Sequence, residues 1–182
     1  MTTKINTKPL ALSNWNDFVA LMKVDSQCSE CWCLNHREPA GCPTGVAAQN
    51  KMQKLTAQNK VSGLLAYQDK ECVGWIAIDP MSELVGHDCQ PSGKPNEWSI
   101  HCIFVRDEFR GQGVSTQLIQ AAIEYAKANG ANLVSAFPIP SENRNNFPVN
   151  EAEFSGRFST YFKLGFKPVA KSSAFYQRME LE

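Results

Sequence analysis

The sequence predicts an α/β protein in which helices pack against one mixed, mostly antiparallel, twisted sheet. Segments typical of strands and helices alternate in the order β-α-α-β-β-β-α-β-α-β-β. Polar turns separate short apolar runs rich in Val, Ile, Phe and Trp, as is typical of strands. Because 182 residues suffice for one sizeable core, we expect a single domain over residues 1–182, with about seven strands and about four helices.

The first half of the chain is expected to contain four strands and two helices. Ser13 or Asn14 can cap the first helix, since either side chain can accept from the free N–H groups of a first turn. Cys, Pro and Gly predict a loop over residues 28–44, and polar residues predict another over 80–96. The expected strands are Lys8–Leu12, Leu64–Tyr67, Cys72–Ile78 and Trp98–Val105, and the expected helices are residues 14–22 and 46–58.

The helix from Gly113 to Asn129 has the clearest periodicity in the sequence. Val114, Leu118 and Tyr125 fall on one face, and Gly130 supplies the left-handed residue that ends the helix. The segments expected after it are a strand over Asn132–Phe137, an irregular stretch over Pro138–Asn150, a helix over Glu153–Leu164, and strands over Phe166–Ala170 and Phe175–Leu181.

The composition is that of an ordinary globular protein, with 43% hydrophobic and 20% charged residues. The 18 Lys and Arg residues balance the 18 Asp and Glu residues. Proteins that bind nucleic acids or membrane surfaces usually carry a positive excess, so we expect neither partner. The first nine residues lack the apolar stretch of a signal peptide, and no apolar run is long enough to span a bilayer. The expected location is therefore the cytoplasm.

The strongest chemical signal is the segment Arg110-Gly111-Gln112-Gly113-Val114-Ser115, between the strand Trp98–Val105 and the long helix. Glycines let backbone N–H groups converge and let a ligand approach closely. The first N–H groups of a helix have no partner inside the helix and lie at the positive end of its dipole, so a diphosphate fits there. A tight turn that binds nothing is the alternative interpretation. A nucleotide P-loop is excluded because no Gly-Lys-Ser/Thr follows.

The segment from Phe104 to Ile119 resembles the acetyl-CoA signature of the GNAT superfamily of N-acetyltransferases, Arg/Gln-x-x-Gly-x-Gly/Ala. Arg110, Gly113 and Ser115 occupy its three defined positions, with Ser115 in place of the usual Gly or Ala. The segment Tyr161-Phe162-Lys163-Leu164-Gly165-Phe166 is similar to the family's Tyr-x-x-x-Gly-Phe, and the expected order of elements matches the family's fold. The resemblance implies an N-acetyltransferase that uses acetyl-CoA as its cosubstrate.

The resemblance also implies how acetyl-CoA is held. In this family a bulge opens the sheet in the strand before the loop, and pantetheine lies along that strand, where the bulge has freed backbone groups. A family Asn that contacts CoA is replaced by Phe154, so that contact is expected to be absent. No metal ligand is expected. The expected cofactor-binding residues are Ile103, Phe104, Val105, Arg110, Gly111, Gln112, Gly113, Val114, Ser115 and Thr116.

Acyl transfer to an amine needs a general base and a general acid. Tyr161 matches the family's general acid, and a buried core tyrosine is the alternative. His101 is the expected base, because imidazole titrates near neutrality and relatives that acetylate arylalkylamines carry histidines at comparable positions. Strand alternation should place His101 on the same face as Ser99 and Ile103. A structural histidine is an equally open interpretation, and Glu97, acting through water, is the second candidate base.

The run Cys28-Ser-Glu-Cys31-Trp-Cys33-Leu-Asn-His36, followed by Cys42, is the second unusual feature. Four of these side chains could bind zinc, but zinc sites normally pair two ligand turns, so zinc is the less favoured interpretation. We favour small apolar side chains that line the acceptor pocket, with redox sensing as a third interpretation. The odd total of seven cysteines argues for reduced thiols. The Cys-Trp-Cys part resembles an uncharacterised branch of the GNAT superfamily.

The sequence therefore predicts acetyl transfer from acetyl-CoA to a primary amine of a small molecule or peptide, by direct attack in a ternary complex. The alternative is a non-catalytic regulatory module that binds CoA or zinc on the same fold. A homodimer is an open expectation, since dimers are frequent in the superfamily. The acidic side chains that could attract an ammonium group, if they are not simply solvated loop residues, are Asp79, Glu83, Asp88, Glu142 and Glu151.

Overall fold

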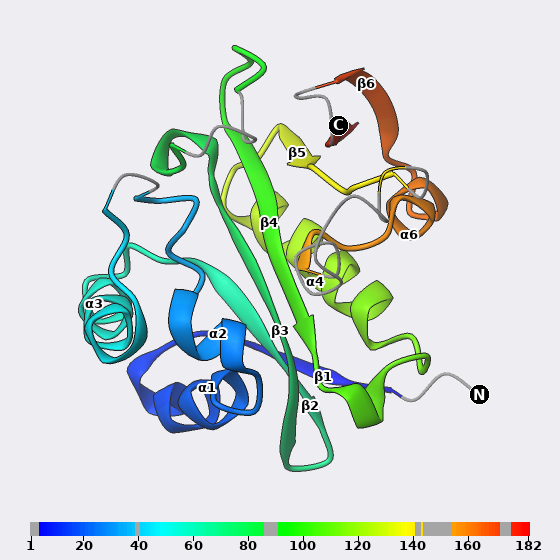
Figure 1. The fold of residues 1–182 in the computed structure, drawn as a ribbon. Coiled ribbons are helices and arrows are strands. Elements are labelled where there is room, and N and C mark those ends of the chain that lie inside the picture. The colour runs from blue at the N-terminus through cyan, green and yellow to red at the C-terminus, as the bar shows by residue number, and fades with distance from the viewer. Residues whose placement is uncertain (1–3, 39–40, 86–90, 141–142, 144–153, 172–175) are drawn as a thin grey trace.

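The computed structural model describes residues 4–38, 41–85, 91–140, 143, 154–171 and 176–182 (Figure 1). Seven strands form one sheet in the order β1-β2-β3-β4-β5-β7-β6. Neighbouring strands are antiparallel except β4 and β5, which are parallel. The mixed, mostly antiparallel sheet is therefore confirmed. The strands are β1 (Asn6–Pro9), β2 (Gly63–Gln68), β3 (Glu71–Pro80), β4 (Glu97–Val105), β5 (Leu133–Ala136), β6 (Lys167–Lys171) and β7 (Gln177–Leu181).

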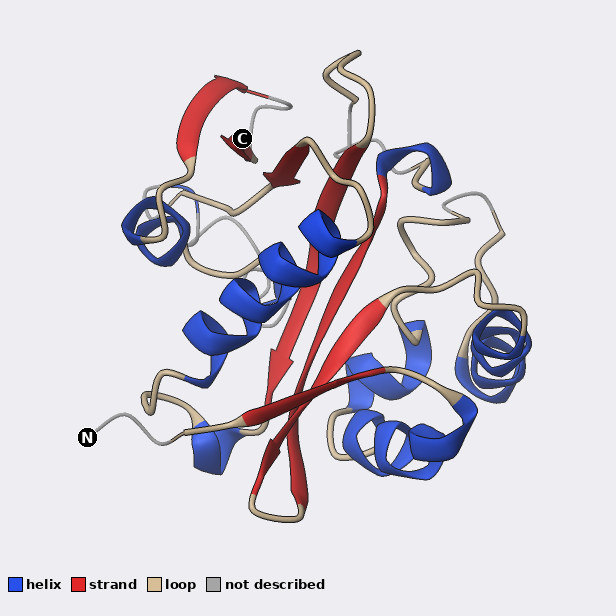
Figure 2. Cartoon of the chain, turned by 180° about the vertical axis from the view of Figure 1, so that it is seen from behind, coloured by secondary structure: helices blue, strands red, loops and turns tan. Residues whose placement is uncertain are grey.

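Helices cover both faces of the sheet, as the two opposite views show (Figures 1 and 2). Among the described residues, no helix combines the length and apolarity that a transmembrane span requires. The α-helices are α1 (Trp15–Met22), α2 (Ser26–Cys31), α3 (Gly45–Ala57), α4 (Val114–Ala128) and α6 (Phe158–Lys163), and the 3-10 turns are η1 (Leu12–Asn14), η2 (Met81–Glu83) and η3 (Asp107–Phe109).

Two apolar cores lie on opposite faces of the sheet, because side chains alternate along its strands. On β3, Trp75 and Ala77 pack in the core beneath α1, α2 and α3, whereas Ile76 and Ile78 pack in the core beneath α4. We call these two sides the N-helix face and the α4 face. Each face is a separate surface on which β4 can present a functional group.

Several boundaries differ from the sequence expectation. The first strand ends at Pro9 instead of Leu12, because only Asn6–Pro9 pair with β2 and a 3-10 turn follows. The expected helix over 153–164 is shorter, since α6 begins at Phe158, and residues 144–153 lie outside the described residues.

The prediction of a loop over residues 28–44 was wrong for its first residues, which belong to helix α2. The Asp25 carboxylate caps this helix by accepting from the backbone N–H groups of Gln27 and Cys28, both at 2.9 Å. The helix ends where Trp32 and Cys33 adopt left-handed backbone conformations. The Trp32 ring then packs in the N-helix core, so burial also holds this short helix in place.

A bulge interrupts β4 at His101. Ala77 of β3 pairs with Cys102 and Ile78 pairs with Ile100, so His101 is the additional residue on β4. Because one extra residue shifts the alternation of side chains, Ile100 and Ile103 both pack on the α4 face. His101 contacts Asp79, which lies on the N-helix face. The expectation that His101 and Ile103 share a face was therefore wrong, whereas the bulge itself was expected.

The cap of α2 can be tested by substitution. Asp25→Ala should lower the free energy of unfolding by about 1 kcal/mol, because two N–H groups lose their acceptor. Urea denaturation followed by circular dichroism measures the change. Asp25→Asn keeps an acceptor oxygen and serves as the control, with a loss of only a few tenths of a kcal/mol. Equal losses in both variants would show that the cap does not stabilise this segment.

Candidate functional site

The parallel strands β4 and β5 pair over only four positions, from Glu97 with Leu133 to Ile100 with Ala136. Beyond Ile100, no described strand pairs with this side of β4. The point of separation coincides with the bulge at His101. The last part of β4 therefore has one backbone edge with no strand beside it among the described residues, and we call it the free edge of β4.

A pocket of about 320 Å³ lies beside this free edge. All but one of the expected cofactor-binding residues line it. They are Ile103–Val105 at the end of β4, Arg110, Gly111 and Gly113 in the loop, and Val114–Thr116 in the first turn of α4. The exception is Gln112, whose side-chain amide donates to the Glu108 carbonyl at 2.9 Å.

The start of α4 presents backbone N–H groups without a capping side chain. Gly113 is the residue before the helix, has a left-handed conformation (φ 82°), and no described side chain accepts from the first turn as a cap. Arg110 is held nearby, since its Nε donates to the Val105 carbonyl at 3.1 Å and its Nη2 pairs with Asp107 at 2.9 Å. Uncapped N–H groups and a guanidinium together form an environment suited to an anion.

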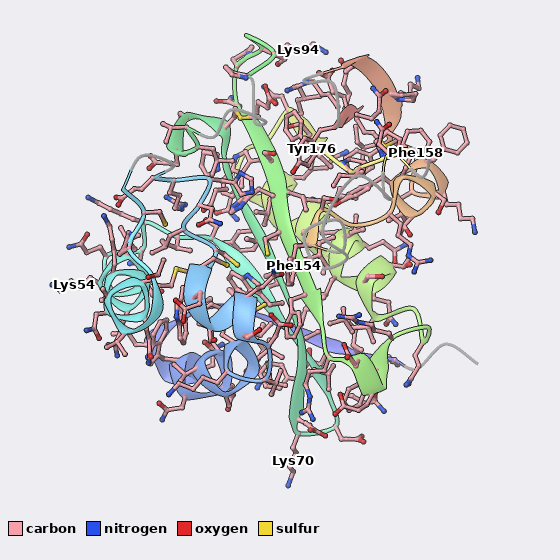
Figure 3. The ribbon with its side chains drawn as sticks, in the orientation of Figure 1. Lys54, Lys70, Lys94, Phe154, Phe158 and Tyr176 are labelled. Carbon is pink, nitrogen blue, oxygen red and sulfur yellow. The ribbon has the colours of Figure 1, made fainter. Side chains whose placement is uncertain are left out.

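The opposite wall of the pocket comes from residues 154–160, which the sequence did not predict as site residues. The Phe154 ring lies 6.1 Å from the Phe104 ring, between centroids, and is labelled in Figure 3. Gly156, Arg157 and Thr160 also line the pocket. Tertiary packing brings this segment to the pocket. In the sequence, only the nearby Tyr-x-x-x-Gly-Phe motif and the position of Phe154, where the family has a CoA-contacting Asn, pointed to it.

Tyr161, the expected general acid, is fully buried in α6. Its hydroxyl donates to the Ser155 carbonyl across a long 3.4 Å. A Cβ atom added at Gly156 would lie 3.0 Å from this hydroxyl oxygen, so the phenol lies against the backbone of a pocket residue. Burial, and secondarily the proximity of Cys102, raises the pKa of Tyr161 above its usual value. The phenol is therefore protonated at physiological pH.

His101, the expected base, does not line the pocket and lies on the N-helix face. Its Nε2 atom is 2.9 Å from Asp79 Oδ2, and both side chains are only 1% exposed. The His36 and His101 rings form a T-shaped pair, with 5.4 Å between ring centroids. Burial, with a smaller contribution from His101, lowers the pKa of His36 to about 3.

Glu97, the second candidate base, is buried at the start of β4 and accepts four hydrogen bonds. Oε1 accepts from Ser135 and Arg178 at 2.7 and 2.6 Å, and Oε2 accepts from the backbone N–H and hydroxyl of Ser92 at 2.8 and 2.7 Å. Burial alone would raise the pKa of Glu97, but these hydrogen bonds outweigh burial and lower it. The carboxylate thus has no oxygen left without a partner.

The acidic residues considered for attracting an ammonium group are scattered. Asp79 lies in β3, is buried, and forms an ion pair with Arg37, so it is not a loop residue. Glu83 is exposed in η2 and lies 3.8 Å from the same arginine. Asp88, Glu142 and Glu151 lie outside the described residues.

The cysteine run packs largely in the N-helix core. Cys28 and Cys33 are buried there, and the Cys33 thiol donates to Cys102 Sγ across 3.3 Å. Burial raises the pKa of the Cys28 thiol. The His36 ring pairs with that of His101. In the described ranges, no group of three or more His, Cys, Asp or Glu side chains is arranged to hold a metal ion.

Part of the sequence is similar to known acetyltransferases. An L-methionine sulfoximine/L-methionine sulfone acetyltransferase of Pseudomonas paraeruginosa is 35% identical over 65 residues, which are 34% of this chain and 38% of that protein. The chain spans between 25% and 38% of the length of the curated relatives it matches.

Solved structures share the fold at low sequence identity. The GNAT domain of S. lividans PAT has a TM-score of 0.62 and 17% identity, over 97% of this chain and 89% of that one. The putative acetyltransferase yncA of Salmonella typhimurium, solved with acetyl-CoA, has a TM-score of 0.59 and 15% identity, over 98% and 93%. Residues 29–148, more than half of the chain, match the acetyltransferase (GNAT) family. The resemblance seen in the two motifs is thus confirmed, and the chain belongs to the GNAT family of acetyltransferases.

Proposed function

We propose that this protein transfers the acetyl group of acetyl-CoA to a primary amine of a small molecule or peptide, by direct attack in a ternary complex. The observation that carries the proposal is the pocket in which the free edge of β4 meets the uncapped start of α4. Family membership supports the reaction class. Bound acetyl-CoA supplies the acetyl group as a thioester.

The pocket residues fit the two polar parts of acetyl-CoA. The first-turn N–H groups of Val114–Thr116 and the guanidinium of Arg110 suit the diphosphate, because an uncapped helix start is a site for anions. The free edge of Ile103–Val105 suits pantetheine, whose amides can bond backbone groups as a strand would. Phe154 supplies an apolar wall in place of the family's Asn.

Tyr161 is our proposed general acid. Its raised pKa keeps the phenol protonated, so it holds a proton for the thiolate that leaves when the acetyl group is transferred. Gly156 allows its hydroxyl to approach the pocket, because any side chain at that position would press on the phenol.

His101 is our proposed general base, and its position suggests where the amine approaches. It lies on the N-helix face at the bulge, where the free edge of β4 begins. Cys102 and Ile103 follow it along that edge. An amine that enters on this face can therefore meet a thioester held at that edge. Glu97 is the weaker candidate, since its four hydrogen bonds occupy both oxygens.

The reaction is tested by incubating the purified chain with acetyl-CoA and a panel of amines. The panel should contain amino acids and analogues such as L-methionine sulfoximine, polyamines, and short peptides with free N-termini. Mass spectrometry should detect an acetylated amine together with an equal amount of free CoA. Tight CoA binding without product across the whole panel would instead support a regulatory module.

Removing the Tyr161 hydroxyl should slow the chemistry without weakening the binding of acetyl-CoA. We expect Tyr161→Phe to lower kcat about 100-fold or more, the usual contribution of a positioned acid. The dissociation constant for CoA, measured by calorimetry, should change less than about twofold, because no hydroxyl contact to the pocket loop is lost. A kcat equal to that of the wild type would remove Tyr161 from the mechanism.

Gly156 should be unusually sensitive to substitution. An Ala at Gly156 (φ 75°) meets Tyr161 Cε2 at 2.9 Å, whereas an Ala at Gly130 (φ 88°) meets nothing within 4 Å. Both substitutions carry the cost of a left-handed residue, about 1–2 kcal/mol, but only Gly156→Ala adds overpacking of about 1–3 kcal/mol. Thermal unfolding should therefore show the larger loss for Gly156→Ala. Equal losses would mean that Tyr161 does not press on this backbone.

A further inference from the structure

Asp79 and His101 form a buried carboxylate–imidazole pair on the N-helix face of the sheet. Asp79 lies near the end of β3 and His101 is the bulged residue of β4. The 2.9 Å separation between Oδ2 and Nε2 is a hydrogen-bond distance, and both side chains are 1% exposed. The pair is therefore shielded from bulk water.

The orientation of the carboxylate is fixed by two other groups. The backbone N–H of Ser62 donates to Asp79 Oδ1 at 2.7 Å, and Arg37 Nη2 forms an ion pair with the same oxygen at 2.5 Å. Oδ2 is consequently the oxygen that faces the imidazole. Since an ionised carboxylate can only accept hydrogen bonds, His101 must carry its proton on Nε2. In the neutral imidazole, Nδ1 is then the unprotonated acceptor.

The acceptor atom Nδ1 is buried and has no hydrogen-bond partner among the described residues. The hydroxyl of Ser99 is also buried and also has no hydrogen-bond partner among the described residues. Ser99 lies two residues before His101 and pairs with Asp79 in the sheet. Buried polar atoms without partners are rare in native proteins, and each needs an explanation. An amine donor bound on this face would satisfy Nδ1.

The charged groups around the pair balance one another. The positive charge of Arg37 compensates the negative charge of Asp79. The Nη1 atom of Arg37 also lies 3.8 Å from Glu83 Oε2. His36, whose ring forms a T-shaped pair with that of His101, is neutral at physiological pH because burial lowers its pKa to about 3. When His101 gains a proton, the new positive charge therefore faces the carboxylate of Asp79 at close range.

We propose that Asp79 is a positioning residue, which fixes His101 in the tautomer protonated on Nε2 and leaves Nδ1 to accept a proton from the acceptor amine. The inference rests on the proposed function, in which His101 is the base. As the new N–C bond forms and the C–S bond breaks, one amine proton moves to Nδ1 and the thiolate takes the Tyr161 proton. Solvent then returns the two side chains to their starting protonation states.

The substitution Asp79→Asn tests the tautomer directly. Ser62 N–H requires an acceptor at the Oδ1 position, and the positive charge of Arg37 favours an oxygen there. The Asn oxygen should therefore stay at that position, and its NH₂ group should face His101. An NH₂ group can only donate, and the imidazole proton must then move to Nδ1. NMR of the full chain labelled with ¹⁵N-histidine reports which nitrogen carries the proton. The sequence has three histidines, and His101→Gln assigns the signal.

We expect the wild-type protein to carry the proton on Nε2 and Asp79→Asn to carry it on Nδ1. The kcat of the variant should fall about 100-fold or more, with the KM for acetyl-CoA unchanged, as expected when a base has the wrong tautomer. Asp17→Asn is the matched control. Asp17 also accepts from a ring side chain, Tyr67, at 2.8 Å, but it does not contact His101. It should change neither the tautomer nor kcat.

The outcomes separate this inference from the function on which it rests. A wild-type His101 with its proton on Nδ1, or an unchanged tautomer in Asp79→Asn, would overturn the role of Asp79. The wild-type spectrum, once His101→Gln has assigned it, decides the first point, so the test survives even if Asp79→Asn does not fold. An unchanged kcat in His101→Gln would overturn the base itself and leave the tautomer result standing.

Discussion

One extra residue in β4 determines how the rest of the site is arranged. At His101 the strand gains a residue relative to β3, and its pairing with β5 ends at the neighbouring Ile100. The same residue shifts the alternation of side chains, so that Ile103 lies on the α4 face while His101 contacts Asp79 on the other. With regular alternation, residues 101 and 103 would share a face, and the imidazole would not be directed toward the N-terminal helices.

The bulge also separates the two proton-transfer groups of the proposed reaction. Tyr161 belongs to the core on the α4 face, and His101 faces the N-terminal helices. The free edge of β4 lies between them. A thioester held at that edge would meet an acid from one side and an amine with its base from the other, which suits direct attack because the nucleophile and the leaving group need opposite directions. In the proposed reaction, the two faces of the sheet would therefore provide the acid and the base separately.

The sequence predicted the parts of the site that depend on residues close together in the chain. The loop before α4 was recognisable because glycines, an arginine and a helical periodicity lie within a few residues. The position of the bulge depends on the register between β3 and β4, which no local pattern predicts. The partners of Asp79 are Arg37 and Ser62, which are distant from it in the sequence, so they were not predictable either. Helix α2 is different, because Asp25 was a readable cap and the Cys-rich composition that follows it was misleading.

Two carboxylates are buried at this part of the sheet, Glu97 in β4 and Asp79 in β3, and they differ in their partners. Buried ion pairs are weak evidence for stability, since an apolar pair of similar volume often stabilises a fold as well. Glu97 directs both oxygens to Ser92, Ser135 and Arg178, and so joins β4 to the preceding loop, to β5 and to β7. Asp79 directs one oxygen to fixed donors and the other to an imidazole, the side chain best suited to change charge near neutrality. The carboxylate paired with an imidazole is therefore the one that we propose takes part in chemistry. The carboxylate bound by two hydroxyls, a backbone N–H and an arginine holds β4 in place.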